Sequence, residues 1–363
     1  MKLIPSGGRL HLPAKEKMVY IILISILLIL LYAGFGLNGK PAVAKSIFVV
    51  SMTPDEMSAA LENGTIAGFI SWEPYPAKAV ADGYGRYLVN SRDIWKNHPE
   101  CVMVISEYVQ DEDMIKALVW VHLKSTRFIN DPANREKVLE YGSEFTGADR
   151  SSVSAALNNT IYIEFPDMNE MKKGFEILDK AGGFKKSLSS MGYSSTDEFL
   201  SSVFPDRYYK EIKNRLDADP DWVPPAVNGS LKFGFIDSDL HNLGLYIAQK
   251  EGFFEKVGLI PDGNIQFRKF RNGQAITTAL HYREVDAAVF GATPVLRYVV
   301  NDNGKVRVIN GVNTGGTSLV VRADSNISSI LDLNGKRIAT PGFGSIQDVI
   351  MRKMFEGFEI KTV

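Results

Sequence analysis

Residues 231–250 constrain the fold more than any other stretch, because they have the pattern of a strand, a polar loop and a helix in direct succession. Residues 231–236 are a short apolar run suited to a buried strand. Residues 237–242 are polar and offer helix N-caps, and 243–250 have an amphipathic helical spacing that should end near Gly252. We expect such a unit at the start of a domain, yet 230 residues precede it.

The alternation of short apolar strands and helices continues to the end of the chain. Predicted strands and helices follow at 265–270, 273–282, 287–290, 294–301, 306–310, 319–322, 337–340 and 345–355. Before this region, strands are predicted at 45–51, 66–71 and 101–106, and helices at 114–129, 134–145, 151–158, 168–181 and 196–204. Alternating strands and helices indicate an α/β architecture built in layers.

An uncharged run rich in Ile and Leu occupies residues 18–37. As a helix it would be about 30 Å long, which matches the hydrocarbon core of a membrane. Four basic residues lie within 1–17, so the positive-inside rule places that segment in the cytoplasm and the chain after the span outside. Residues 38–46 would be a linker. A cleavable signal is the alternative, because Ala42-Val43-Ala44 resembles a cleavage site, and the protein would then be secreted or periplasmic.

Composition excludes several classes of protein. The net charge is −1 and the sequence has no basic stripe, so we expect no nucleic-acid partner. Cys101 is the only cysteine. One thiol cannot form a disulfide framework or a cysteine-based metal site, so we expect neither a metal nor a cofactor. The length of 363 residues allows two lobes of ordinary domain size and an appendage.

Three phrases stand out in the second half of the sequence. Residues 252–259 are Gly-Phe-Phe-Glu-Lys-Val-Gly-Leu, 286–294 are Asp-Ala-Ala-Val-Phe-Gly-Ala-Thr-Pro, and 331–339 are Leu-Asp-Leu-Asn-Gly-Lys-Arg-Ile-Ala. In this order they resemble segments of periplasmic solute-binding proteins of the nitrate, sulfonate, taurine and bicarbonate type, and Pro341–Ser345 is similar to a loop of their second lobe. The family's next segment contains a Trp-Glu-Pro-Tyr phrase, whose counterpart is Trp72–Tyr75, near the other end of this chain.

The order of these segments indicates a circularly permuted chain. Joining Val363 to Val49 on paper gives a continuous family-like sequence, so the cut would fall in a strand of the second lobe. The resemblance then implies a two-lobed periplasmic-binding-protein-like α/β fold of type II, permuted, with an N-terminal transmembrane helix. One window of a longer tandem array, or a truncated or misassembled reading frame, would give the same order.

The permuted order implies a division of the chain into lobes. Lobe 2 would consist of 47–105 and 323–363, and lobe 1 of 106–216 and 230–322. The Pro-rich segment 217–229 would be a linker that joins the ancestral termini. The two crossings between lobes are expected at 104–108 and 319–322.

Most candidate ligand residues lie in loops that precede predicted helices. In an open α/β sheet, ligands bind beyond the carboxyl ends of the strands, where helix N-termini present free N–H groups. The resemblance implies the same positions. The candidates from these loops are Asp237, Ser238, His241, Asn242, Gly291, Ala292, Thr293, Gly344 and Ser345. Each of these loops could equally be an ordinary turn without a ligand.

Four further residues complete the predicted site, namely Trp72, Glu73, Asn313 and Thr317. Trp72 offers an apolar wall with one N–H donor, although core packing is its alternative role. Glu73 could accept a hydrogen bond from a ligand amine or lock its own loop. Asn313 and Thr317 belong to the polar approach to an expected interlobe crossing.

The predicted function is solute capture without catalysis. The resemblance implies a monomer at the extracytoplasmic membrane face that delivers a small anion or zwitterion to the permease and ATPase subunits of an ABC importer. A thiamine-pyrimidine-precursor binding or synthase-like protein is one alternative, although the cysteine-rich motif of the synthases has no counterpart here. A sensory ectodomain and a broken gene product are the others.

Overall fold

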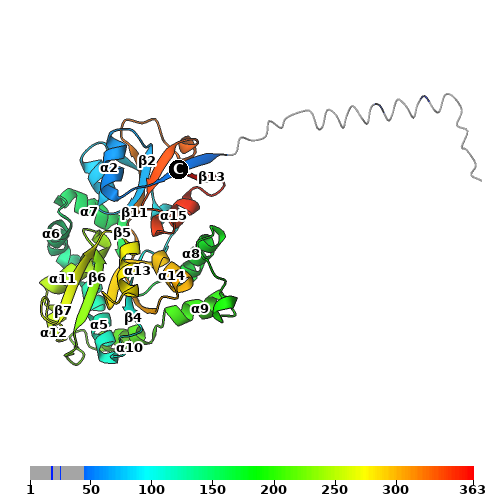
Figure 1. Ribbon diagram of the computed structural model, residues 1–363. Helices are drawn as coiled ribbons and strands as arrows, with labels where there is room; N and C mark the ends of the chain where they lie inside the picture. Colours follow the sequence, from blue (N-terminus) through cyan, green and yellow to red (C-terminus); the bar gives the residue numbers. More distant parts are fainter. Residues whose placement is uncertain (1–17, 19–24, 26–44) are drawn as a thin grey trace, which may run out of the picture. The chain divides into compact units, whose positions relative to one another are not determined.

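The computed structural model describes Met18, Ser25 and residues 45–363, of which 46–363 form one compact unit (Figure 1). Within these described residues, no helix is both long and apolar enough to cross a membrane. The span predicted at 18–37 lies, apart from Met18 and Ser25, outside the described residues.

The first of two large sheets, sheet A, combines strands from both ends of the described chain. Its six strands run in the order β13-β1-β12-β2-β11-β3. Their bounds are β1 Ser46–Ser51, β2 Gly68–Trp72, β3 Gly85–Asn90, β11 Thr317–Arg322, β12 Arg337–Thr340 and β13 Glu359–Thr362. Neighbours from β13 to β2 are parallel, whereas β11 is antiparallel to both β2 and β3.

Strand β1 is held between β12 and β13, so the blue and red ends of the ribbon lie side by side (Figure 1). Ile47 lies opposite Ile360 of β13, and Val49 lies opposite Ile338 of β12. Ile47 and Val49 are buried while their neighbours are more exposed, because successive side chains of a strand project to opposite faces. The first and last strands of the described chain therefore share one hydrogen-bonded sheet.

Sheet B is built mainly from the second half of the chain. Its five strands run in the order β7-β6-β8-β4-β9. Their bounds are β4 Cys101–Ser106, β6 Leu231–Ile236, β7 Ile265–Phe270, β8 Ala287–Gly291 and β9 Val306–Gly311. Strands β7, β6 and β8 are parallel, and β4 is antiparallel to both of its neighbours.

Strands β4 and β11 do not lie in the lobes that the sequence predicted for them. The expected lobe boundary grouped β4 with the strands of sheet A and β11 with those of sheet B, but each hydrogen-bonds in the opposite sheet. The chain therefore crosses between the sheets at 91–100 and 312–316, and not at 104–108 and 319–322. All six residues of β4 are buried, and a uniformly apolar run carries no signal of which sheet it joins.

Helices pack around both sheets. Their bounds are α2 Pro54–Glu62, α3 Tyr75–Ala81, α4 Ser91–Ile94, α5 Glu112–Asn130, α6 Arg135–Thr146, α7 Arg150–Asn159, α8 Met168–Lys180, α9 Thr196–Val203, α10 Arg207–Ala218, α11 Leu243–Lys250, α12 Phe253–Lys256, α13 Gly273–His281, α14 Ala292–Asp302 and α15 Ile346–Met354. The expected strand 231–236 and helix 243–250 form with the predicted bounds, whereas α10 and β3 were not predicted.

Alternate residues of the central strands belong to different apolar layers. Val289 of β8 packs in a core with residues of α5, α10 and α11, whereas Phe290 packs in a second core with residues of α13 and α14. The second core also includes Ile47 of β1, Ile70 of β2 and Ile350 of α15. One continuous apolar layer therefore joins the two sheets.

The Pro-rich segment between α10 and β6 packs against the helices of sheet B. The indole N–H of Trp120 donates to the Trp222 carbonyl at 2.7 Å. Val227 is buried, and its N–H donates to the Val257 carbonyl at 2.8 Å. The segment therefore follows a fixed path along the body.

A substitution in β1 tests whether this strand stabilises the whole unit. We expect Ile47→Ala to lower the free energy of unfolding by about 2–5 kcal/mol, because Ile47 is fully buried in the core that joins the sheets. Urea unfolding measures the change. Lys361→Ala on the exposed side of β13 is the control and should change stability little. An unchanged urea midpoint for Ile47→Ala would contradict the packing of β1.

Candidate functional site

A cavity of about 260 Å³ lies between the two sheets. One wall comes from sheet A, through Trp72 at the end of β2 and residues 341–347, the loop after β12 with the start of α15, which we call the loop 341–347. The other wall comes from sheet B, through Ile236 at the end of β6 and Gly291 at the end of β8. The cavity therefore lies beyond the carboxyl ends of parallel strands, where α/β sheets bind ligands.

The loop 341–347 is fixed by its own hydrogen bonds. Ser345 is the N-cap of α15 and its hydroxyl accepts from the Asp348 N–H at 3.1 Å. The Asp348 carboxylate in turn accepts from the Gly344 N–H at 2.9 Å. A side-chain carboxylate thus already occupies the positive end of this helix. An anion in the cavity would find fewer free N–H donors there than the sequence alone indicates.

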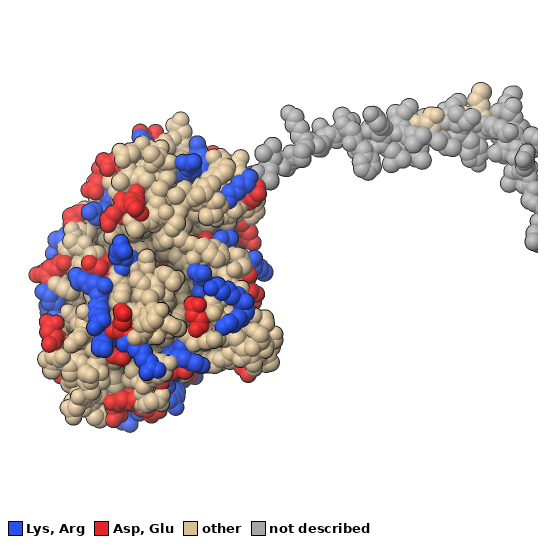
Figure 2. All heavy atoms as spheres, viewed as in Figure 1, with Lys and Arg blue, Asp and Glu red and all other residues tan. Residues whose placement is uncertain are grey.

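Helix α14 connects this loop to sheet B. The Thr293 hydroxyl donates to the Gly344 carbonyl at 3.1 Å, and the Arg297 guanidinium donates to the Phe343 carbonyl at 2.8 Å. Arg297 and the exposed Lys185 also line the cavity and place positive charge at its edge. On the face that Figure 2 shows, basic and acidic side chains are interspersed, as a net charge of −1 would lead us to expect.

Sheet B contributes a cluster of buried polar side chains to the cavity wall. Cys101 Sγ lies 3.7 Å from His241 Nδ1, and His241 Nδ1 lies 3.4 Å from Asp239 Oδ1. The possible ligand atoms of these three residues all lie within 4.8 Å of one another. We call this group the Cys–His–Asp cluster; its geometry is compatible with a metal ion.

The backbone fixes the tautomer of His241. Its Nε2 lies 3.1 Å from the Gly316 carbonyl oxygen, which can only accept, so Nε2 carries the proton when the ring is neutral. Nδ1 then holds a lone pair near Cys101 and Asp239. Burial lowers the pKa of His241 to about 3, so the ring is neutral at physiological pH and its contact with Asp239 is not an ion pair.

The acids beside this cluster are buried. Burial raises the pKa of Asp239 to about 8, although the His241 N–H donates to its carboxylate. Burial also raises the pKa of Glu100 well above its ordinary value, with a further contribution from the charge of Asp239. The pKa of the Cys101 thiol is raised well above its ordinary value by the same burial. Asp239 and the thiol are therefore mainly protonated at neutral pH when nothing positive is bound, and burial favours the neutral form of Glu100 as well.

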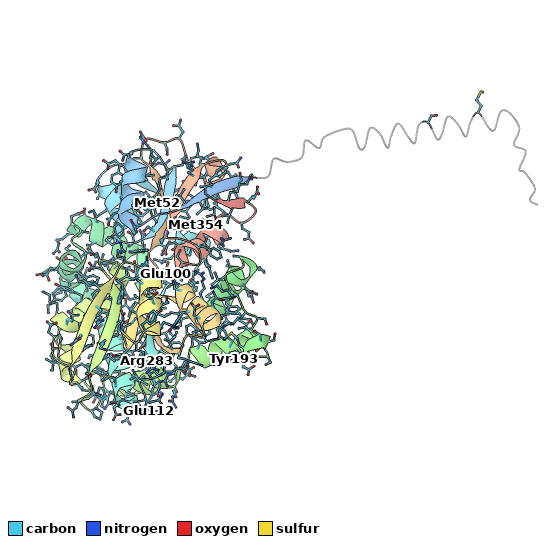
Figure 3. The ribbon with its side chains drawn as sticks, in the orientation of Figure 1. Met52, Glu100, Glu112, Tyr193, Arg283 and Met354 are labelled. Carbon is cyan, nitrogen blue, oxygen red and sulfur yellow. The ribbon has the colours of Figure 1, made fainter. Side chains whose placement is uncertain are left out.

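Glu100 is 1% exposed and lies between the two sheets (Figure 3). Neither of its carboxylate oxygens has a well-formed hydrogen bond to any part of the chain that the structure describes. The Thr317 hydroxyl lies near enough to offset a little of the rise in its pKa. The Trp72 indole N–H, which also lines the cavity, likewise has no acceptor within residues 45–363. A bound molecule could satisfy both groups.

Five predicted site residues line the cavity, namely Trp72, His241, Gly291, Gly344 and Ser345. Three others support its walls from behind. Thr293 bonds to Gly344, Thr317 accepts from the Gln347 amide at 3.0 Å, and Asn313 accepts from the Cys101 N–H at 3.2 Å.

The remaining five predicted residues do not line the cavity. Asp237 is exposed and pairs with Lys269 at 3.0 Å, and the neighbouring Ser238 has a left-handed backbone with φ 57°. The Asn242 amide donates to the Ile236 carbonyl at 3.2 Å, and Ala292 is buried in the second core. Glu73, the fifth, belongs to a separate network.

Glu73 locks its own loop. Its carboxylate accepts from Tyr87 of β3 at 3.0 Å, from Asn159 of α7 at 2.9 Å and from the Ala77 N–H in α3 at 3.0 Å. Asn159 also links this network to the crossing segment, since its carbonyl accepts from the Gly316 N–H at 2.8 Å. Burial raises the pKa of Glu73 to about 7 despite these donors.

Sequence reasoning missed Glu100, Cys101 and Asp239 as lining residues. Asp239 lies inside the predicted loop 237–242, so the sequence left open only whether its side chain points into the cavity. Cys101 begins β4 and Glu100 directly precedes it. Because β4 is antiparallel to β8, this end of the strand meets the carboxyl end of β8. That placement depends on the direction of β4 in the sheet, which its residues do not encode.

The fold and cavity define an α/β protein of two sheets that enclose a site of small-molecule size. In sequence, residues 26–142 match the NMT1-like family, and residues 240–362 match the family described as NMT1/THI5 like. The chain therefore belongs with the NMT1-like proteins, the group of nitrate, sulfonate, taurine and bicarbonate binding proteins that the sequence phrases indicated. Proteins of this group are mostly solute-binding proteins without catalytic activity, with a synthase branch.

Curated relatives come from cyanobacterial import systems. The chain is 36% identical over 111 residues to the nitrate import ATP-binding protein NrtC of Synechococcus elongatus, which is 30% of this chain and 16% of that protein. It is 28% identical over 98 residues to the bicarbonate transport ATP-binding protein CmpC of Synechocystis, which is 26% of this chain and 15% of that protein. The match thus spans about one sixth of the length of these relatives.

The Glu73 network predicts a pH dependence of stability. Because the pKa in the folded protein, about 7, lies above the ordinary value of 4.5, the folded state binds this proton more tightly than the unfolded state. The stabilisation is complete below pH 4.5 and is lost as the pH rises through 7. It amounts to at most about 3 kcal/mol.

Glu73→Gln should remove this contribution. We expect the wild-type free energy of unfolding to fall more steeply between pH 4.5 and 8 than that of the variant, as measured by urea unfolding across that range. Glu107→Gln, at an exposed position, is the control. Parallel pH profiles for the wild type and Glu73→Gln would show that Glu73 has an ordinary pKa.

Proposed function

We propose that this chain is an extracytoplasmic solute-binding protein that captures a small anion or zwitterion for an ABC importer. The observation that carries the proposal is the cavity whose two walls come from different sheets, joined by contacts of α14 with the loop 341–347. Such a cavity can close on a ligand by a small motion of one sheet against the other. No reaction is part of this proposal.

The solute class is supported by the relatives and by the groups at the cavity edge. The relatives are named for nitrate import and for bicarbonate transport. Arg297 and Lys185 offer positive charge, and the Trp72 indole offers a free donor. A micromolar affinity requires about 8 kcal/mol in total, so several such groups must act together.

A second candidate is a thiamine-pyrimidine-precursor binding protein. The observation that favours it is the pair of buried acids, Glu100 and Asp239, in the same cavity as the flat side chain of Trp72. An aminopyrimidine presents a planar ring and N–H donors, which suit a stacking surface and unpaired carboxyl oxygens.

The circularly permuted order of the chain and the location of the protein outside the membrane are parts of the same proposal. Pairing of β1 with both β12 and β13 supports a circularly permuted type II periplasmic-binding-protein fold, with sheet A and sheet B as its two lobes. The uncharged run at 18–37 supports an N-terminal membrane anchor with the rest of the chain outside, acting as a monomer with a permease and an ATPase.

A ligand panel tests the proposed function. Thermal unfolding of the full chain is measured with nitrate, bicarbonate, taurine, an alkyl sulfonate and an aminopyrimidine. A true ligand at 100 times its dissociation constant should stabilise the protein by about 2.7 kcal/mol. Stabilisation by an anion or zwitterion supports the first candidate, and stabilisation by the pyrimidine alone supports the second. No shift with any of these solutes would contradict both.

Trp72→Phe should weaken binding of the solute found in that panel. The change keeps an aromatic wall and removes the indole N–H donor. A hydrogen bond to a charged acceptor contributes about 1.5–3 kcal/mol, so the dissociation constant should rise roughly 10–100-fold in isothermal titration calorimetry. Trp222→Phe, at a position that does not line the cavity, is the matched control. Equal affinities of Trp72→Phe and wild type would exclude the indole as a ligand group.

A further inference from the structure

The Cys–His–Asp cluster and the adjoining Glu100 bring several acceptor atoms together, and the side-chain donors among them are only the thiol and carboxyl protons that a metal would displace. The described surroundings give Asp239 one N–H, from His241, and give neither Glu100 oxygen a well-formed partner. His241 Nδ1 holds a lone pair, because Gly316 fixes the proton on Nε2. His241 Nδ1 lies 3.4 Å from an Asp239 oxygen, and this contact needs a proton or a cation between the two atoms. Without a metal the protonated Asp239 carboxyl supplies the proton, and a metal ion would take its place.

The distances within the cluster suit a transition metal. Tetrahedral zinc with Zn–S of about 2.3 Å and Zn–N or Zn–O of about 2.0–2.1 Å separates its ligand atoms by about 3.6 Å for S and N and about 3.4 Å for N and O. The observed separations are 3.7 Å from Cys101 Sγ to His241 Nδ1 and 3.4 Å from His241 Nδ1 to Asp239 Oδ1. The third pair, Cys101 Sγ and the Asp239 carboxylate, lies within 4.8 Å, so a metal ion would need that pair to close to about 3.6 Å while the other two pairs move little.

The surroundings of His241 also match a metal ligand. A histidine that binds a metal usually donates its other ring N–H to a carbonyl or carboxylate, which fixes the ring orientation. His241 has this arrangement, with the Gly316 carbonyl as the partner of Nε2. Gly316 has a left-handed φ of 84°, and a Cβ there would lie 2.2 Å from His241 Nε2. The backbone is thus shaped to receive this ring.

We propose that Cys101 Sγ, His241 Nδ1 and the Asp239 carboxylate form a binding site for a divalent transition metal of the zinc class, with Glu100 or a molecule in the cavity at the fourth position. Mixed sulfur, nitrogen and oxygen ligands favour such metals over Mg²⁺ or Ca²⁺. The thiol and the carboxyl groups lose their protons when the metal binds, and its two positive charges offset the buried acids.

The site would explain why buried acids line a cavity in a relative of anion importers. It does not depend on the proposed function, because metal binding is measured without any solute. The expectation of no metal counted cysteines only, whereas this site needs a single thiol together with His241 and Asp239.

Cobalt titration of the metal-free full chain tests the site, because thiolate-bound Co²⁺ has a charge-transfer band in the near ultraviolet and four-coordinate Co²⁺ has intense visible bands. Cys101 is the only cysteine, so a thiolate band can come from no other residue of the chain. We expect both bands to saturate at one equivalent of Co²⁺ and to disappear when Zn²⁺ is added. A charge-transfer band would therefore assign Cys101 as a metal ligand directly.

Variants locate the ligands. Cys101→Ser should lose the charge-transfer band, and Asp239→Asn should weaken Co²⁺ binding by at least the roughly 10–100-fold that loss of a supporting partner costs. His281→Ala, an exposed histidine on α13, is the control and should bind like the wild type. Circular dichroism confirms that each variant is folded. The proposal is overturned if the folded wild type shows no thiolate band at saturating Co²⁺, or if Cys101→Ser and Asp239→Asn both bind Co²⁺ like the wild type.

Discussion

The pairing of β1 with β12 and β13 is the interaction on which the rest of the structure depends. These strands come from opposite ends of the described chain and form parallel hydrogen-bonded ladders. Their contact places β12 beside β2, and the carboxyl ends of these two neighbours carry the loop 341–347 and Trp72. One wall of the cavity exists only because residues separated by almost the whole described chain lie in one sheet.

The second wall depends on the direction of a single strand. Because β4 is antiparallel to β8, its first residues reach the edge at which β6 and β8 end. Glu100 and Cys101 are thereby placed beside Asp239 and His241. This wall is rich in acceptors, and Arg297 and Lys185 also line the cavity, so the lining carries both acidic and basic groups. A solute with both kinds of charge, or an anion beside a bound cation, would suit it.

Local patterns predicted elements better than they predicted contacts. Helix 243–250 and strand 231–236 formed with the expected bounds because apolar spacing and turn residues act within a few positions. The predicted sheet membership of β4 and β11 was wrong, because a fully buried apolar strand can pack in either sheet. Of the predicted loop residues, His241 lies in the 3-10 turn Leu240–Asn242 and lines the cavity, whereas Asp237 precedes that turn and pairs with Lys269 at the surface. The placement of Glu100 and Asp239 in the cavity could be recognised only from the three-dimensional structure.

Hydrogen–deuterium exchange of the full chain, with and without a stabilising solute, tests most directly whether the two sheets form one binding site. A shared cavity predicts that peptides covering Trp72 and 341–347 in sheet A gain protection together with peptides covering 236–241 and 272–277 in sheet B. Protection confined to peptides of one sheet, or spread over the surface away from these segments, would contradict a site built jointly by both.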